Sequence, residues 1–305
     1  MINESFWCII VAEKYRRKWV FFMSANTAKF SIALDENDNR VHISMAKRGG
    51  IYYCPLCKTR MIPKLGTVKM HHYAHQSLET CDEWYENKGP WHRQMQSLFP
   101  FDCQEVIVER NGEKHIADIC LKKPNGQHLI IEFQHSPMDH EEFVKRTAFW
   151  RGTGDDIIWV FDVADKLISE VIGFEDKYCD KMFRWKKPIP TLGTGYMDEI
   201  PIFLYMQPKM IKWNGAEKVD RDFSVGKPFF MLLQSCGCDD SVEDYSHFYF
   251  GFELQPYDLV GGKVYESTSA FKQFVNERML IKETRPFQPN LKLRSHAELE
   301  DSDAT

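Results

Sequence analysis

Two acidic residues stand on either side of a short turn near the middle of the chain. Asp118 ends the run HIAD, and Glu132 lies two residues before Gln134 in the run IEFQ. The segment Pro124-Asn125-Gly126 between them is typical of a hairpin loop whose last residue is left-handed. A hairpin centred on this loop places Asp118 opposite Glu132, and strand alternation puts Gln134 on the same face. Opposed carboxylates repel unless something binds between them, and oxygen ligands suit Mg²⁺, so the pattern predicts a metal-assisted hydrolase. The alternative is a pair of exposed acids on a solvated sheet face.

A second group of residues suited to chemistry lies upstream. Cys54 and Cys57 form a C-x-x-C pair, which on a tight turn points two thiolates at one ion. His75 and Cys81 can complete a tetrahedral Zn²⁺ site, with His72 as an alternative ligand. An ion held by four protein ligands would be structural. Two alternatives stay open: a redox C-x-x-C, although little room is left for the helix that such motifs open, and cysteines packed in a core.

The segments around the acidic pair are expected to fold as helix, three strands, helix and strand. Apolar spacing predicts a helix over 84–99 and a strand over 104–110, followed by the two hairpin strands. Ser136 before a proline is typical of a helix start, and this helix is expected to run to about Trp150. The apolar run 157–163 predicts a buried strand.

The flanking regions carry weaker patterns. Short apolar runs at 7–11, 19–23 and 41–45 indicate a β-rich start. After about residue 180 we expect aromatic-rich strands at 202–206, 229–234 and 248–254 and a helix at 269–280. The acidic end from residue 286 is typical of a disordered tail.

Composition limits the class of protein. The 305 residues are 43% hydrophobic, and no segment approaches the roughly 20 apolar residues of a membrane helix. The N-terminus has neither a basic start nor a long apolar run, so we expect a cytoplasmic protein without a membrane partner. In the reducing cytoplasm, paired cysteines indicate a metal site or a catalytic role rather than disulfides. A formal charge of −5 does not by itself indicate a nucleic-acid binder, although local basic patches stay open.

Taken together, these motifs resemble the competence protein CoiA-like family. Its members look like nucleases of the PD-(D/E)XK superfamily fused to an N-terminal zinc-binding segment. The resemblance covers about residues 50–165, and the C-terminal third matches only in general texture. It is carried by CPLC at 54–57, HYAH at 72–75, CD at 81–82, WHR at 91–93, FP at 99–100, EVI at 105–107, HIAD at 115–118, IEFQHSP at 131–137 and WV at 159–160.

The resemblance implies roles for individual residues. Asp118 and Glu132 would be the first and second metal-binding acids, and Gln134 stands where the superfamily more often has lysine. His92 and Glu105 match further family positions. The chain departs from the family at Pro90, where an acid is common, and Glu86 is the nearest upstream acid.

The sequence thus predicts an α/β protein with a restriction-endonuclease-like mixed sheet. We expect a β-rich and zinc-binding module at 1–82, a nuclease-like core at 83–178, a C-terminal α+β region at 179–285 and a tail at 286–305. The implied function is Mg²⁺- or Mn²⁺-dependent hydrolysis of DNA in bacterial competence, recombination or defence, with structural Zn²⁺. Recombination or defence proteins are further candidate partners. A weakly active DNA-binding accessory factor and a protein-interaction adaptor are the alternatives.

Several other polar residues could assist this chemistry. His92, His115 and His135 are candidate proton donors or phosphate ligands, with His135 ranked below His92 because it should point to the other face of its strand. Three basic residues of the second helix could contact a nucleic-acid backbone, although a solvated helix face is the simpler interpretation: Lys145, Arg146 and Arg151.

Overall fold

The chain divides into two compact units, Met1–Lys88 and Gly89–Thr305, which are described separately. The structure is a computed structural model. None of its described helices is long and apolar enough to cross a membrane. The described residues are 29–76, 81–85, 87–136, 138, 140–152, 154–163, 168–172, 181–185, 189–193, 200–206, 228–233, 253–254 and 259–281.

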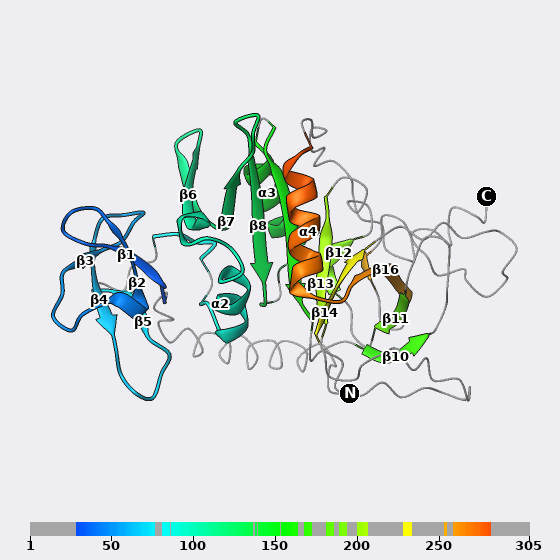
Figure 1. The fold of residues 1–305 in the computed structure, drawn as a ribbon, viewed down its shortest axis with the longest axis horizontal. Helices are drawn as coiled ribbons and strands as arrows, with labels where there is room; N and C mark the ends of the chain where they lie inside the picture. The colour runs from blue at the N-terminus through cyan, green and yellow to red at the C-terminus, as the bar shows by residue number, and fades with distance from the viewer. Residues whose placement is uncertain are drawn as a thin grey trace, which may run out of the picture. The chain divides into compact units, whose positions relative to one another are not determined.

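The N-terminal unit is a small antiparallel sheet with the strand order β2-β1-β3-β4-β5 (Figure 1). Phe30, just before β1, also pairs with Tyr73 of β5, so the sheet curls back on itself. Both residues are buried with Tyr52 and Met61 in the small core of this unit. The elements are β1 (Ile32–Leu34), β2 (Arg40–His42), the 3₁₀ helix η1 (Ile43–Met45), β3 (Tyr52–Tyr53), β4 (Arg60–Lys64) and β5 (His72–His75).

The second unit is built on a mixed sheet. The described strands follow the order β10-β11-β16-β14-β13-β9-β8-β7-β6, in which β9 lies parallel to both β8 and β13 and the other pairs are antiparallel. The strands are β6 (Gln104–Arg110), β7 (Glu113–Lys122), β8 (His128–Gln134), β9 (Asp156–Asp162), β10 (Ile168–Ile172), β11 (Lys181–Trp185), β13 (Ile202–Met206), β14 (Phe229–Leu233) and β16 (Leu259–Tyr265). A separate pair joins β12 (Ile189–Gly193) to β15 (Glu253–Leu254).

Helices cover both faces of this sheet. One face packs its apolar side chains against Met95 of α2 (Pro90–Gln96) and Phe271 of α4 (Thr268–Met279). On the other face, Phe143 of α3 (His140–Arg151) contacts Trp159 of β9. Figure 1 shows α4 in front of the strands and α3 behind them. A short 3₁₀ helix, η2 (Phe101–Cys103), leads into β6.

The predicted α/β class with a mixed sheet is confirmed, as is the element order from α2 to β9. Strand 104–110 and strand 202–206 have the predicted bounds. The first helix is shorter than expected: it begins at Pro90 and ends at Gln96, because proline favours the first helical position and the chain turns at Ser97. The second helix begins at His140 rather than beside Ser136.

The C-terminal strands extend the same sheet. The division expected at residue 179 falls between β10 and β11, which pair with each other. The helix at 269–280 is α4, and β14 and β15 fall within the stretches expected at 229–234 and 248–254. The apolar runs at 7–11 and 19–23 and the tail from 286 lie outside the described residues.

Candidate functional site

The β7–β8 hairpin brings the two predicted acids face to face. Ile119 pairs with Ile131, so the next position in the same register sets Asp118 opposite Glu132. The loop has the expected form: Gly126 is left-handed with φ +88°, a conformation that a side chain would disfavour. The amide of Gly126 donates to the Lys123 carbonyl at 3.0 Å. The turn residues therefore fix which side chains meet across the two strands.

Both acids are buried. Asp118 is 6% exposed and Glu132 is 3% exposed, so the alternative of acids on a solvated sheet face does not hold. Each carboxylate accepts a backbone hydrogen bond from the opposite strand: Glu132 Oε1 from the Asp118 amide at 3.1 Å, and Asp118 Oδ2 from the Phe133 amide at 2.9 Å. These bonds hold the two side chains in a fixed geometry and stabilise their charged forms.

Helix α2 supplies a histidine to the first acid. His92 Nε2 lies 2.8 Å from Asp118 Oδ1, and both side chains are almost completely buried. The ring nitrogen makes no hydrogen bond of good geometry among the described residues, so the contact is an ion pair when the ring is protonated. One turn further along α2, the Gln96 amide donates to the Asp118 backbone carbonyl at 3.4 Å. The short helix therefore presents two polar side chains to Asp118.

Helix α3 supplies a cation to the second acid. Arg146 Nη2 lies 3.5 Å from Glu132 Oε2, and Arg146 Nη1 donates to Gln134 Oε1 at 3.5 Å. The guanidinium also lies over the Trp159 ring, 5.7 Å from its centroid. Arg146 and Arg151 are 4% and 3% exposed. The expectation that both could contact a nucleic-acid backbone is wrong, because they point into the protein; of that helix's three basic residues, only Lys145 is exposed.

Sequence reasoning missed this role of Arg146, although the pattern contained a signal for it. Phe143, Thr147 and Trp150 were expected on one helix stripe, and all three are fully buried. Arg146 falls on the same stripe at the helical spacing. A basic residue on an apolar stripe needs a buried acid as its partner, and Glu132 is that acid.

Two further predicted residues lie beside the pair. Gln134 is buried and donates from Nε2 to the Ser136 carbonyl at 2.8 Å. Glu105 is also buried, and the β6–β7 register sets it opposite Asp118. Its φ of +46° is a left-handed conformation that costs a non-glycine residue about 1–3 kcal/mol. Strain of this kind at a buried acid is a common property of functional sites.

The other two candidate histidines are engaged elsewhere. His115 Nε2 lies 2.8 Å from Glu113 Oε1. His135 Nδ1 lies 2.7 Å from Asp162 Oδ2, with a side chain 56% exposed. His92 is therefore the histidine that the structure brings to Asp118.

The donor atoms of this pair suit a hard divalent cation. Asp118, Glu132 and Gln134 offer only oxygen ligands, which are those that Mg²⁺ and Mn²⁺ prefer. In this structure the same oxygens contact His92 and Arg146. A bound ion would therefore share the two carboxylates with these side chains.

The predicted zinc ligands form a compact cluster in the N-terminal unit. The ligand atoms of Cys54, Cys57, His75 and Cys81 all lie within 4.8 Å of one another. Cys54 Sγ is 3.5 Å from Cys81 Sγ, and Cys57 Sγ is 3.3 Å from His75 Nε2. This spacing fits a tetrahedral ion with bonds of about 2.0–2.3 Å.

The turn between β3 and β4 aims the first two thiols. The Cys54 amide donates to the Thr59 carbonyl at 2.8 Å, and the Lys58 amide donates to the Cys54 carbonyl at 3.0 Å. Lys58 is left-handed with φ +61°, which closes the turn. His72 is not part of the cluster: its Nδ1 lies 2.8 Å from the Met70 carbonyl oxygen.

The grouped thiols influence one another's protonation. The hydrogen bond from Cys81, more than any other contact, lowers the pKa of Cys54 to about 5. The same bond raises the pKa of Cys81 well above its usual range. One thiolate beside a second, protonated thiol is the expected state of a soft-metal ligand set before the ion displaces the remaining proton.

Two family models match the chain. The model described as "Competence protein CoiA, N-terminal domain" matches residues 35–83, which include all four clustered ligands. The model described as "Competence protein CoiA, nuclease-like domain" matches residues 111–172, which include Asp118, Glu132 and Arg146. No curated protein and no solved structure matches the chain.

Proposed function

Because this chain belongs to the competence protein CoiA-like family, we propose that it is a nuclease that hydrolyses DNA with Mg²⁺ or Mn²⁺. The observation that carries the proposal is the buried pair of Asp118 and Glu132, which face each other across a hairpin of the nuclease-like domain. Burying two opposed carboxylates is costly, and a protein keeps them where their charge has a use. The setting would be a cytoplasmic competence, recombination or defence process.

Asp118 and Glu132 would hold the ion, with Gln134 as a neutral oxygen ligand beside them. A bound divalent ion lowers the pKa of its water and neutralises the scissile phosphate. Gln134 carries no charge, so it would orient the attacking water while Arg146 fixes its amide oxygen. Arg146 also places a positive charge beside Glu132, because its guanidinium lies 3.5 Å from Oε2.

His92 is suited to move a proton at this site. Its Nε2 lies 2.8 Å from Asp118 Oδ1 without an aligned hydrogen bond, which places a titratable group directly beside the carboxylate that would hold the ion. Glu105 would act by position, adding negative charge opposite Asp118 and strengthening cation binding.

The zinc cluster would have a structural role. Its four ligands come from the β3–β4 turn, β5 and the segment after it, so one ion would join parts of a small unit with a modest core. A site filled by four protein ligands leaves no position for a substrate.

The test is cleavage of linear duplex, single-stranded and branched DNA by the full chain with Mg²⁺ or Mn²⁺. Wild type should cut, and Asp118→Asn and Glu132→Gln should each lower the rate about 10²- to 10³-fold. Glu109→Gln, an exposed acid of β6, is the matched control and should cut normally. The absence of metal-dependent cutting by wild type on every substrate would reject the proposal.

One observation favours a second candidate function. The chain would then be a DNA-binding accessory factor whose nuclease-like core has little catalytic activity. Both carboxylates already have protein partners, His92 and Arg146, and a pair so compensated does not require an ion. Under this alternative, DNA would bind equally well with and without Mg²⁺, and Asp118→Asn would leave binding unchanged.

A further inference from the structure

The N-terminal unit carries a concentration of positive charge that its zinc cluster does not explain. Between Asp38 and Glu79 the sequence contains seven Lys and Arg residues and not a single Asp or Glu, although the whole chain has a net charge of −5. The ligands of the zinc cluster are three cysteines and a histidine, so these basic residues have no part in it.

Most of these residues surround one pocket. It has a volume of about 1010 Å³ and lies among β4, the loop from 65 to 71 and the residues before β3. No acidic side chain lines it in the part of the chain that the structure describes. Its basic lining residues are Lys29, Arg48, Arg60, Lys64, Lys69 and His72.

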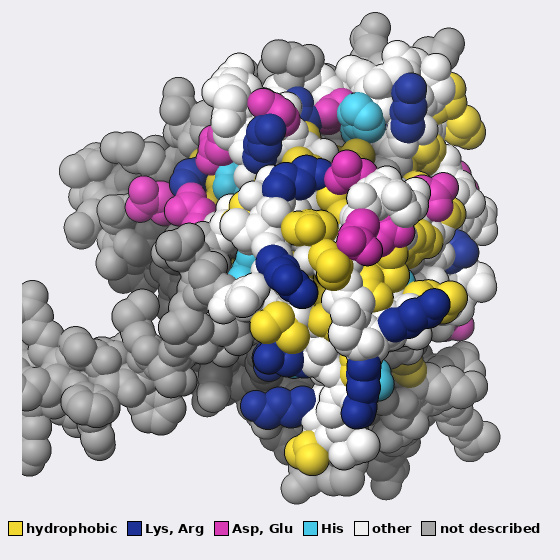
Figure 2. All heavy atoms as spheres, turned by 90° about the vertical axis from the view of Figure 1, so that its left-hand side faces the viewer, with side chains coloured by type: hydrophobic (Ala, Val, Ile, Leu, Met, Phe, Trp, Pro, Cys, Tyr) yellow, Lys and Arg dark blue, Asp and Glu magenta, His cyan; other side chains and the backbone are white. Residues whose placement is uncertain are grey.

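The charges around the pocket are not compensated by ion pairs with the carboxylates that the structure describes. None of the five Lys and Arg residues is ion-paired with any described carboxylate, whereas Lys58, outside the pocket, pairs with Asp38 at 3.2 Å. Four of the five are exposed, and Lys29 is half-buried. Figure 2 is viewed from the side of the N-terminal unit, and several Lys and Arg side chains in it are separated from the acidic side chains. Like charges held together without acids repel, and a bound polyanion would relieve that repulsion.

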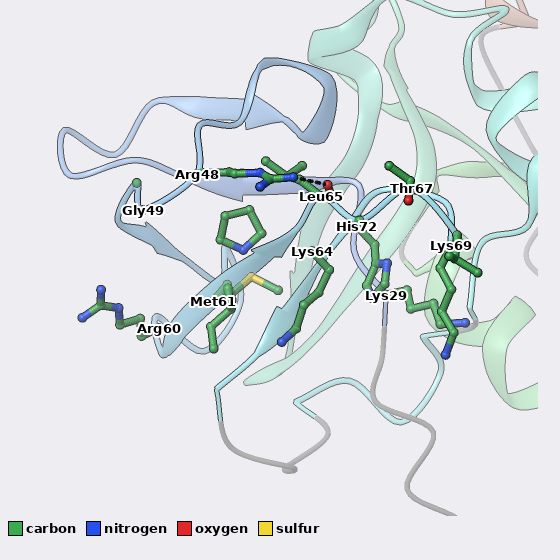
Figure 3. Close-up of a pocket in the computed structure, with 15 residues that line it drawn as sticks. Lys29, Arg48, Gly49, Arg60, Met61, Lys64, Leu65, Thr67, Lys69 and His72 are labelled. Carbon is green, nitrogen blue, oxygen red and sulfur yellow. Dashed lines mark hydrogen bonds between the residues drawn. The ribbon is translucent and has the colours of Figure 1, made fainter.

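The arrangement suits an extended ligand. Figure 3 shows Arg48 and Arg60 to one side of the pocket and Lys64, Lys29 and Lys69 to the other. One guanidinium nitrogen of Arg48 donates to the Leu65 carbonyl at 3.3 Å, which ties the two walls together (Figure 3). A pocket of about 1010 Å³ with cations on two sides has room for a chain of phosphates that contacts both sides.

The lining also indicates which part of a nucleic acid would be bound. Among the described residues no Phe, Tyr or Trp lines the pocket, so it offers no platform on which bases could stack. Flexible lysines and arginines bind phosphate oxygens without regard to base identity.

We propose that this pocket, defined by Lys29, Arg48, Arg60, Lys64 and Lys69, binds the sugar–phosphate backbone of DNA independently of base sequence. The choice of DNA rests on the proposed function, whereas recognition of the phosphates rests on the charges alone. The pocket then serves as a substrate-holding surface separate from the residues that cut.

The test is binding of a fluorescein-labelled DNA to the full, zinc-loaded chain, measured by anisotropy without Mg²⁺ over a range of salt concentrations. If all five cations contact phosphates, log affinity should fall with log salt concentration with a slope of about −4.5 for duplex DNA, or about −3.5 for a single strand. The triple variant Arg60→Ala/Lys64→Ala/Lys69→Ala should bind at least 10-fold more weakly at moderate salt, with a slope smaller by about 2 to 3.

A matched triple variant controls for net charge. Lys114→Ala/Lys122→Ala/Lys272→Ala removes the same charge from exposed positions outside the pocket and should bind nearly as well as wild type. An unchanged zinc content shows that the variants are folded. Equal loss of affinity in both triple variants, or no loss in the first, would overturn the proposal.

The outcomes separate this inference from the nuclease proposal. Normal metal-dependent cleavage together with unaltered binding by the first triple variant would reject the pocket and keep the nuclease. Pocket-dependent binding without cleavage on any DNA would keep the pocket and count against the nuclease.

Discussion

The two units of this protein gather metal-ligating side chains in opposite ways. In the N-terminal unit, the ligand atoms of three cysteines and a histidine lie within 4.8 Å of one another. In the second unit, Asp118 and Glu132 lie opposite each other, but backbone amides, His92 and Arg146 already bind their oxygens. Under the proposed function, the first arrangement would need an ion to be stable, whereas the second would be stable without one and could exchange it. That difference is what separates a structural metal from a catalytic one.

The largest effect is expected when one ligand of the zinc cluster is removed. Cys54→Ser should abolish stoichiometric Zn²⁺ binding and unfold the N-terminal unit, because structural zinc contributes about 10–16 kcal/mol of apparent binding energy to such small folds. Metal content and proteolysis of the 29–88 region would measure this. Cys103→Ser, a partly buried cysteine outside the cluster, is the control and should retain the ion.

The next largest effect is expected when the positive charge beside Glu132 is removed. Arg146→Met keeps the side-chain volume but removes the guanidinium that lies 3.5 Å from the buried Glu132 carboxylate, so the free energy of unfolding should fall by about 3–5 kcal/mol. Urea denaturation measures the loss, and Mg²⁺ should restore part of it by taking the place of the guanidinium. Lys145→Met, at the exposed neighbouring position, should change stability by no more than about 0.5 kcal/mol. Equal stability of both variants would contradict the assigned role of Arg146.

A smaller effect is expected at His92. Replacing it by glutamine removes the group that contacts Asp118 Oδ1, and a neighbour of a metal ligand typically contributes about 10- to 100-fold to activity or metal affinity. His92→Gln should therefore cut DNA more slowly by that factor, measured under single-turnover conditions. His135→Gln changes an exposed histidine paired with Asp162 and should leave the rate unaltered.

The smallest change concerns the pH dependence of the zinc cluster. Protons compete with the ion for thiolates, so Zn²⁺ affinity should decrease as the pH falls, and it should fall more steeply below the pKa of Cys54 at about 5, where this thiolate also takes up a proton. At neutral pH the proton released on binding should come mainly from Cys81, whose pKa is raised by its bond to Cys54. A competition assay with a coloured zinc chelator between pH 8 and pH 5 measures the change. Constant affinity over this range would contradict a cluster built from thiolates.

The local pattern of the sequence predicted much of both sites. Gly126 at the end of its loop determined the hairpin register, and that register set Asp118 against Glu132. The C-x-x-C pair predicted the tight turn that aims Cys54 and Cys57, because its spacing leaves few other geometries. These features depend on residues close together in the chain.

Features that depend on distant residues were not predictable in the same way. The burial of Arg146 needs β8 and α3 to pack, and the pairing of β9 with β13 joins strands about forty residues apart. Helix α2 is shorter than its apolar spacing suggested, because Pro90 starts it late. Periodicity indicates which face of an element is buried, but not which partner covers it.

The most direct test of the contrast between the two units is selective metal removal from the intact protein. Dialysis against a chelator too weak to compete for thiolate-bound zinc should leave one Zn²⁺ per chain and abolish DNA cleavage, and added Mg²⁺ should restore cleavage without refolding. Cleavage that persists without Mg²⁺, or that returns only when Zn²⁺ is added, would contradict the account.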